Sequence, residues 1–195
     1  MPISTDPSTY EFARDWLVSS ETFCRDALGA DALDLDTYRA QARDRIHFEE
    51  AFAEPDLEEA NEATPDQPSP LAGLPRVILR MTDYRERLVG IGTHSCSGTI
   101  EVCVEVPVPE AYQINYADDD AATQASKFKD RKTWARQLWT TCKQELWKTR
   151  GQGDGDTPYL NAAEINGLPP ADPEPQEGGD VANWVGWIWE VVWKG

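Results

Sequence analysis

The chain has few basic side chains for its length. Its 195 residues include 18 lysines and arginines against 35 aspartates and glutamates, which gives a net charge of −17. A protein that binds nucleic acid through general neutralisation of phosphates needs the opposite balance. The composition therefore argues against nonspecific nucleic-acid binding by the molecule as a whole.

Histidine, cysteine and long apolar runs are also scarce. Only His47 and His94 are present, and the four cysteines form no CxxC pair. Cys103 and Cys142 stand among apolar residues, which predicts small buried side chains in a reducing compartment. The first residues lack the basic and apolar regions of a signal peptide. No apolar run reaches the length of a membrane span, so we expect no membrane partner.

Three short motifs contain residue types found in reactive or metal sites. His94, Ser95 and Cys96 place a base beside two nucleophiles, but adjacent side chains rarely reach attack geometry and no orienting acid can be identified. The aspartates in segments 118–120 and 154–156 could hold a hard cation, but neither segment has the spacing of an EF-hand loop. We therefore expect a loop histidine and solvated carboxylates, with no catalytic residue, no metal and no cofactor.

Tryptophan is concentrated at the end of the chain, with four in residues 184–193. A period of two places Trp187, Trp189, Val191 and Trp193 on one face of a strand. The opposite face is also largely apolar, which favours a strand covered on both sides. We expect this strand to belong to the core.

The order of the remaining elements predicts an α+β fold. We expect one domain over residues 1–195, with a mostly antiparallel β-sheet and with a long helix and N-terminal helices packed against it. The long helix is expected to cover one sheet face, and the first helix, with Phe12 and Trp16, the other face near Trp184. The acidic, proline-rich segment 49–74 and the segment 167–182 are predicted loops. Helices are predicted at 9–18, 23–29, 34–43 and 122–150, and strands at 45–48, 76–81, 86–91, 99–107, 159–165 and 184–193.

The long helix has the most distinctive predicted surface. Its apolar side chains from Phe128 to Leu146 fall in one arc of about 140° at 100° per residue. Residues 127–150 have a net charge of +6, which leaves −23 for the rest of the chain. Basic residues and one tryptophan line a ridge beside the apolar arc. This basic ridge consists of Lys129, Lys132, Arg136, Lys143, Trp147 and Arg150.

The basic ridge has two main interpretations. A solvated helix face is the simpler one. Tryptophan and arginine are enriched at interface hot spots, however, and opposite potentials steer partners together. The ridge therefore also fits an interface with a negative surface, and a contact of this kind between copies of the chain would be heterologous and able to close into a ring. Nucleic acid is a weaker alternative because the surrounding field is negative.

Several segments resemble the tail terminator (tail-completion, or neck) proteins of long-tailed bacteriophages. Residues 17–29 resemble their "small, x, x, aromatic" helical segment, and residues 38–48 their alanine- and arginine-containing helix that runs into a first strand. Residues 97–102 resemble the "Ser-Gly-x-aliphatic" start of a central strand. The long helix, residues 159–165 and the closing strand with its tryptophans resemble the last half. The resemblance spans most of the chain and is a pattern of elements rather than a catalytic signature.

The resemblance implies a structural virion protein of the phage neck that is made in the host cytoplasm. Such proteins form a ring, expected to be a hexamer, that ends growth of the tail tube and joins the tail to the head-side neck. The expected partners are the tail tube protein and a head-side connector protein, and DNA passes through the lumen without being read. Six copies would carry about −102, six times the charge of one chain, and a negative lumen repels phosphates.

Three alternatives stay open at this point. The chain could be another head–tail connector or a tail-tube subunit. It could be an unrelated, non-catalytic adaptor, or a small enzyme or metal-binding module.

Overall fold

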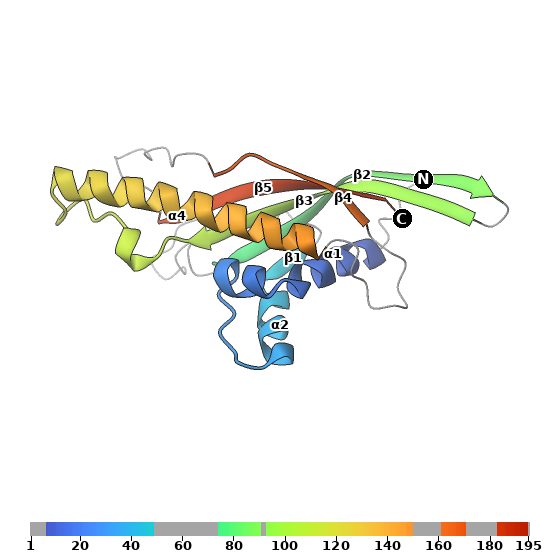
Figure 1. The fold of residues 1–195 in the computed structure, drawn as a ribbon, viewed down its shortest axis with the longest axis horizontal. Helices are drawn as coiled ribbons and strands as arrows, with labels where there is room; N and C mark the ends of the chain where they lie inside the picture. Colours follow the sequence, from blue (N-terminus) through green and yellow to red (C-terminus); the bar gives the residue numbers. More distant parts are fainter. Residues whose placement is uncertain (1–6, 49–73, 91–92, 150–160, 171–182, 195) are drawn as a thin grey trace, which may run out of the picture.

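The computed structural model describes residues 7–48, 74–90, 93–149, 161–170 and 183–194 (Figure 1). They form one five-stranded sheet in the order β1-β2-β3-β5-β4 with helices packed against it. β1 runs parallel to β2 and all other neighbours are antiparallel, which confirms the predicted α+β class. The elements are α1 (Pro7–Ser19), η1 (Phe23–Ala27), α2 (Leu35–Arg43), β1 (Ile46–Phe48), β2 (Arg76–Gly90), β3 (Thr93–Pro107), η3 (Glu110–Tyr112), α4 (Ala121–Lys148), β4 (Asn161–Asn166) and β5 (Trp184–Lys194).

The N-terminal helices begin and end where local sequence signals favour it. The short element η1 is a π-helix, and the chain leaves it through Gly29 at a φ of 62°, a conformation that suits glycine. Asp34 caps α2 by accepting a hydrogen bond from the backbone amide of Thr37 at 2.9 Å. These positions agree with the helices predicted at 23–29 and 34–43.

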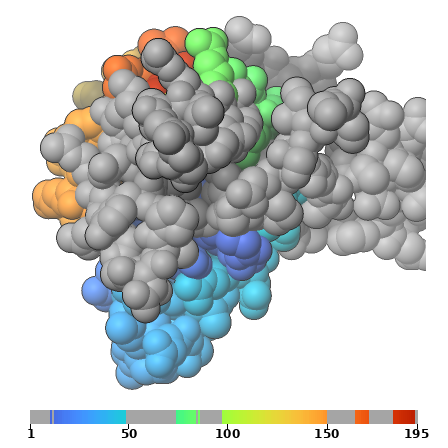
Figure 2. Space-filling model, turned by 90° about the vertical axis from the view of Figure 1, so that its right-hand side faces the viewer, coloured from blue at the N-terminus to red at the C-terminus, as the bar shows by residue number. Residues whose placement is uncertain are grey.

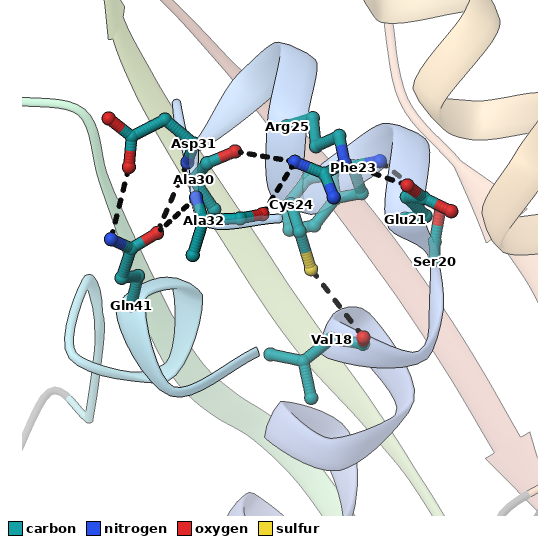
Figure 3. A network of polar contacts seen from close by, with 10 residues as sticks. All are labelled: Val18, Ser20, Glu21, Phe23, Cys24, Arg25, Ala30, Asp31, Ala32 and Gln41. Carbon is teal, nitrogen blue, oxygen red and sulfur yellow. Dashed lines mark hydrogen bonds and ion pairs between the residues drawn. The ribbon is translucent and has the colours of Figure 1, made fainter. Parts of the chain in front are cut away.

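A polar network joins η1 to α2 (Figure 3). The Arg25 guanidinium donates to Glu21 at 2.7 Å and to the carbonyl of Ala32 at 3.0 Å, and it lies 4.5 Å from the centroid of the Tyr38 ring. The Gln41 side chain accepts from the amide of Ala32 at 3.2 Å. These groups satisfy the backbone of the connecting loop, so the cluster has a structural role.

The hairpin of β2 and β3 is longer than predicted. Segments 76–81 and 86–91 were expected as two strands, but β2 is a single strand with register shifts between Met81 and Asp83 and between Leu88 and Gly90. The expectation of a loop at His94 is wrong, because residues 94–98 belong to β3 and His94 pairs with Leu88. Serine and glycine favour turns by themselves, but the backbone ladder with β2 overrides that local preference. The hairpin extends beyond the helices (Figure 1).

The core lies on one face of the sheet. Val104 pairs with Val77 on one side and Trp187 on the other, and the next inward row joins Leu79, Val102 and Trp189 in the same way. Trp189 is fully buried, with the Phe23 ring 6.0 Å and the Trp187 ring 5.6 Å from its own. The alternation predicted for β3 and for the tryptophan face of β5 is confirmed. The inward residues of β3 are Ile100, Val102, Val104 and Val106, and those of β5 are Val185, Trp187, Trp189, Val191 and Trp193.

The outer face of β5 is not covered as predicted. Trp184 is 36% exposed and Ile188 is 50% exposed. Trp16 of α1, expected near Trp184, belongs instead to the same core cluster as the inward residues of the sheet. The first helix therefore packs on the inner side together with η1, α2 and α4, and the expectation of a strand covered on both faces is wrong. The Phe12 side chain and most of the predicted loops 49–74 and 167–182 lie outside the described residues.

Candidate interaction surface

Helix α4 buries one stripe against the sheet and η1. Ala135, Leu138, Cys142 and Leu146 are all buried, which confirms the predicted apolar arc. Phe128, Trp134 and Trp139 of the same arc are half-buried at its margins. The arc fixes how α4 is rotated about its axis, and thereby which side chains it presents outward.

Arg131 is the one member of this stripe that the sequence analysis missed. Its side chain is only 1% exposed, and Nη2 donates to the carbonyl of Trp184 at 2.9 Å. Burial lowers the pKa of its guanidinium. Its spacing of four and seven residues from Ala135 and Leu138 was a signal that could have placed it inward. Arg131 ties α4 to the start of β5.

The basic ridge lies beside the buried stripe, as the helical spacing predicts. Lys129 and Arg136 are exposed, whereas Lys132 and Lys143 are half-buried. Trp147 is 38% exposed, and the C-terminal part of α4 that carries it lies at the molecular surface (Figure 2). Over 18 residues of helix the ridge extends roughly 27 Å. Arg150, the last predicted member, lies outside the described residues.

The C-terminal part of the ridge borders a groove of about 670 Å³ between α4 and β4. Trp139 and Trp147 of α4 line it, with Ile165 of β4 as a further apolar contact. The Lys143 Nζ lies 4.9 Å from the centroid of the Trp139 ring, a cation–π geometry. Lys148, also in the lining, pairs with Glu145 on its own helix.

The groove unites only part of what the sequence analysis singled out. Of the basic ridge, Lys143 and Trp147 line it, and Lys129, Lys132 and Arg136 do not. Trp139, Lys148 and the β4 residues were not predicted as interface members. Their contribution depends on β4 lying beside α4, a tertiary contact that helical periodicity cannot reveal.

The aspartates of segment 118–120 all have structural partners. Asp118 accepts from the Asn115 side chain at 2.6 Å, and Asp120 caps α4 by accepting from the Thr123 amide at 2.7 Å. Asp119 pairs with Lys127 at 2.8 Å, and that hydrogen bond holds the pKa of its carboxyl below the usual value. Within the described residues no group of three histidine, cysteine or acidic side chains is arranged to hold a metal ion. Residues 154–156 are outside that part of the chain.

The buried thiols are poorly suited to nucleophilic chemistry. Burial raises the pKa of Cys24 to about 11 and that of Cys142 to about 12, so both stay protonated at neutral pH. The prediction of a buried Cys142 is confirmed, whereas Cys103 is half-buried on the outer sheet face. Burial, and secondly the nearby charge of Arg76, lower the pKa of His47. The side chains of His94, Ser95 and Cys96 are not among those described.

Comparison of the chain with family models, with curated proteins and with solved structures gave no match. Among the described helices, none is both long enough and apolar enough to cross a bilayer. These comparisons therefore assign no family to the chain.

Proposed function

We propose that this chain is a non-catalytic structural subunit of the tail terminator kind. In this proposal, copies of the chain assemble into a ring at the head-proximal end of a phage tail tube. The ring ends growth of the tube and joins it to the head-side neck. The proposal rests on the resemblance of the chain to that family and on a surface suited to protein contacts.

The observation that carries the proposal is the basic ridge on α4. Lys129, Arg136 and Trp147 are exposed on a helix whose region has a net charge of +6, in a chain whose remainder has −23. Exposed tryptophan and arginine are typical anchors of protein interfaces. A positive patch on one side of an otherwise acidic subunit is complementary to other surfaces of the same subunit, which favours heterologous contacts and closed rings.

The chemistry of the described residues also favours a structural role over a catalytic one. The buried thiols of Cys24 and Cys142 are held in their protonated form by desolvation. Asp119 and Asp120 are engaged by Lys127 and by the start of α4. None of these groups is positioned as an activated nucleophile or base in the way that catalysis requires.

Reversal of charge on the basic ridge tests the proposal. We expect Lys132, Arg136 and Lys143, all changed to Glu, to leave the fold intact and to abolish ring assembly. Three changes are needed because single exposed charge pairs contribute only roughly 0–1 kcal/mol. Light scattering gives the particle mass, negative-stain images give its shape, and circular dichroism checks the fold.

A charge-matched variant provides the control. Arg43, Arg80 and Arg85 have side chains that are 43%, 47% and 78% exposed, and they belong to α2 and β2 rather than to α4. Their joint change to Glu alters the net charge by the same amount, so rings should persist if the ridge is the contact. Rings that form equally well after ridge reversal would identify the ridge as a solvated face. A protein that stays monomeric at every concentration, even with tail tubes added, would contradict the proposed function.

A further inference from the structure

The groove between α4 and β4 combines apolar and cationic surface. Trp139, Trp147 and Ile165 supply the apolar lining, and Lys143 and Lys148 supply positive charge. Within the described residues Lys143 contacts the Trp139 ring but forms no ion pair with a carboxylate. Among the described residues of the lining, Glu164 is the one acidic group. Lys148 already pairs with Glu145, so Lys143 is the lining cation that a ligand would neutralise. A ligand that fits this lining carries a carboxylate next to apolar side chains.

The groove lies at an edge of the sheet. β4 is the last strand in the order β1-β2-β3-β5-β4, and among the described elements only β5 pairs with it. Among the described strands none lies beyond β4, so a groove along this edge strand is able to receive a chain segment from outside. The position of the groove therefore favours a polypeptide ligand over a small molecule.

The chain itself contains a segment of the required chemistry. Residues 49–66 hold eight acidic residues and no lysine or arginine, together with Phe52 and Leu57. No other stretch of this length in the chain is as acidic. Its carboxylates complement Lys143, and its apolar side chains suit the tryptophan faces of the groove.

This segment joins the described part of the chain at the opposite edge of the sheet from the groove. The segment follows β1, which is at one edge of the sheet, and the groove borders β4 at the other. The two edges are four strand spacings apart, roughly 19 Å. A donor at one edge and an acceptor at the opposite edge allow each copy to give one segment and receive another, and such head-to-tail contacts propagate until they close.

We propose that the groove between α4 and β4 binds the acidic segment 49–66 of a neighbouring copy of this chain. This inference rests on the assembly proposed above, since it names the contact that would join one copy to the next. Lys143 meets a carboxylate of the segment, and Trp139 and Trp147 cover its apolar side chains.

Zero-length cross-linking of the full-length protein tests the contact. Equal amounts of unlabelled and ¹⁵N-labelled protein are mixed, treated with a carbodiimide that joins amines to carboxylates, and analysed by mass spectrometry. We expect linked peptides that connect Lys143 or Lys148 to carboxylates of residues 49–66, with light and heavy chains joined in the same product. Links of Lys148 to its own neighbour Glu145 are expected in any case and serve as an internal reference. Links to residues 49–66 that are confined to one isotope, or mixed-isotope links from these lysines only to carboxylates outside that segment, would overturn the proposal.

Two tryptophans of similar exposure give a matched pair of variants. Trp147 in the groove is 38% exposed, and Trp184 on the outer sheet face is 36% exposed. We expect Trp147→Ala to reduce the mixed-isotope links roughly tenfold or more, as loss of an aromatic anchor does, and Trp184→Ala to preserve them. Undiminished links in Trp147→Ala would show that the tryptophan does not form the site.

The same samples separate this inference from the proposed function. Rings in negative stain without the expected links would overturn the groove contact and leave the ring proposal standing. The expected links in a protein that forms only pairs or filaments would support the groove contact and overturn the ring. A protein that gives neither rings nor links would contradict both.

Discussion

At the scale of single residues, Gly98 shows how a closely packed aromatic side chain constrains the sequence. Gly98 of β3 pairs with Trp193 of β5. A Cβ atom at this position would lie 2.5 Å from the carbonyl oxygen of Asp83 and 2.9 Å from Nε1 of Trp193. The Asp83 oxygen belongs to the paired backbone of β2 and cannot move independently. Only glycine therefore fits between the strand and the indole ring.

We expect Gly98→Ala to lower the free energy of unfolding by about 1–3 kcal/mol, the usual cost of forcing an extra carbon into a packed site. Chemical denaturation followed by tryptophan fluorescence measures this change. Ser97→Ala, one residue earlier in β3, adds no atom and should stay within about 0.5 kcal/mol of the native protein. Equal stability of Gly98→Ala and the native protein would mean that Trp193 does not pack over Gly98.

At the scale of elements, β5 has one buried and one open face. Val191 is 4% exposed and points inward, and its neighbour Val192 is half-buried on the outer face. Threonine has nearly the shape and the strand preference of valine, so Val→Thr changes mainly polarity. The two adjacent valines therefore report on the two faces of the same strand.

We expect Val191→Thr to cost about 1–3 kcal/mol, because it places a hydroxyl in an apolar core. Val192→Thr should cost less than about 0.5 kcal/mol, since its hydroxyl reaches solvent. Thermal and denaturant unfolding of the dilute protein measure both changes. An equally large cost for Val192→Thr would indicate that another layer covers the outer face.

The sequence predicts elements better than it predicts which of their faces are covered. The α4 stripe of Ala135, Leu138 and Cys142 follows from helical period alone. The coverage of β5 does not follow in this way, because an apolar residue such as Ile188 signals a strand equally well on a buried or an open face. The choice depends on where α1 packs, and that is decided by the shared core rather than by local pattern.

The candidate surface was also predictable only in part: the ridge on α4 could be predicted, and the groove beside it could not. Periodicity placed Lys143 and Trp147 on one side of α4, because the direction of each side chain depends only on the geometry of that helix. The groove could not be predicted, because Ile165 and Glu164 reach it only through the antiparallel pairing of β4 with β5. Contacts between segments distant in the chain require the topology of the sheet.

At the scale of the whole molecule, charge is unevenly distributed. The net charge is −17, although the region of α4 is positive. Excess charge of one sign destabilises a compact state through self-repulsion. Attraction between the basic ridge and the acidic remainder opposes that repulsion. The dependence of stability on salt shows which of the two effects dominates.

We expect the melting temperature to rise when sodium chloride increases from about 0.01 M to about 0.15 M, as the screening length falls from roughly 30 Å to roughly 8 Å. Long-range repulsion is screened by this change, while the exposed ion pairs lost with it are individually weak. Three changes of lysine or arginine to Glu lower the net charge from −17 by six, to −23. The melting temperatures of the ridge-reversed variant and of the variant of Arg43, Arg80 and Arg85 should therefore both rise more steeply with salt than that of the native protein. The opposite result is a melting temperature that falls with salt in the native protein and rises with salt only in the ridge-reversed variant. That result would mean that attraction between charges holds α4 to its own subunit. The basic ridge would then stabilise the fold of one copy, and its charges would be less available to bind a second copy.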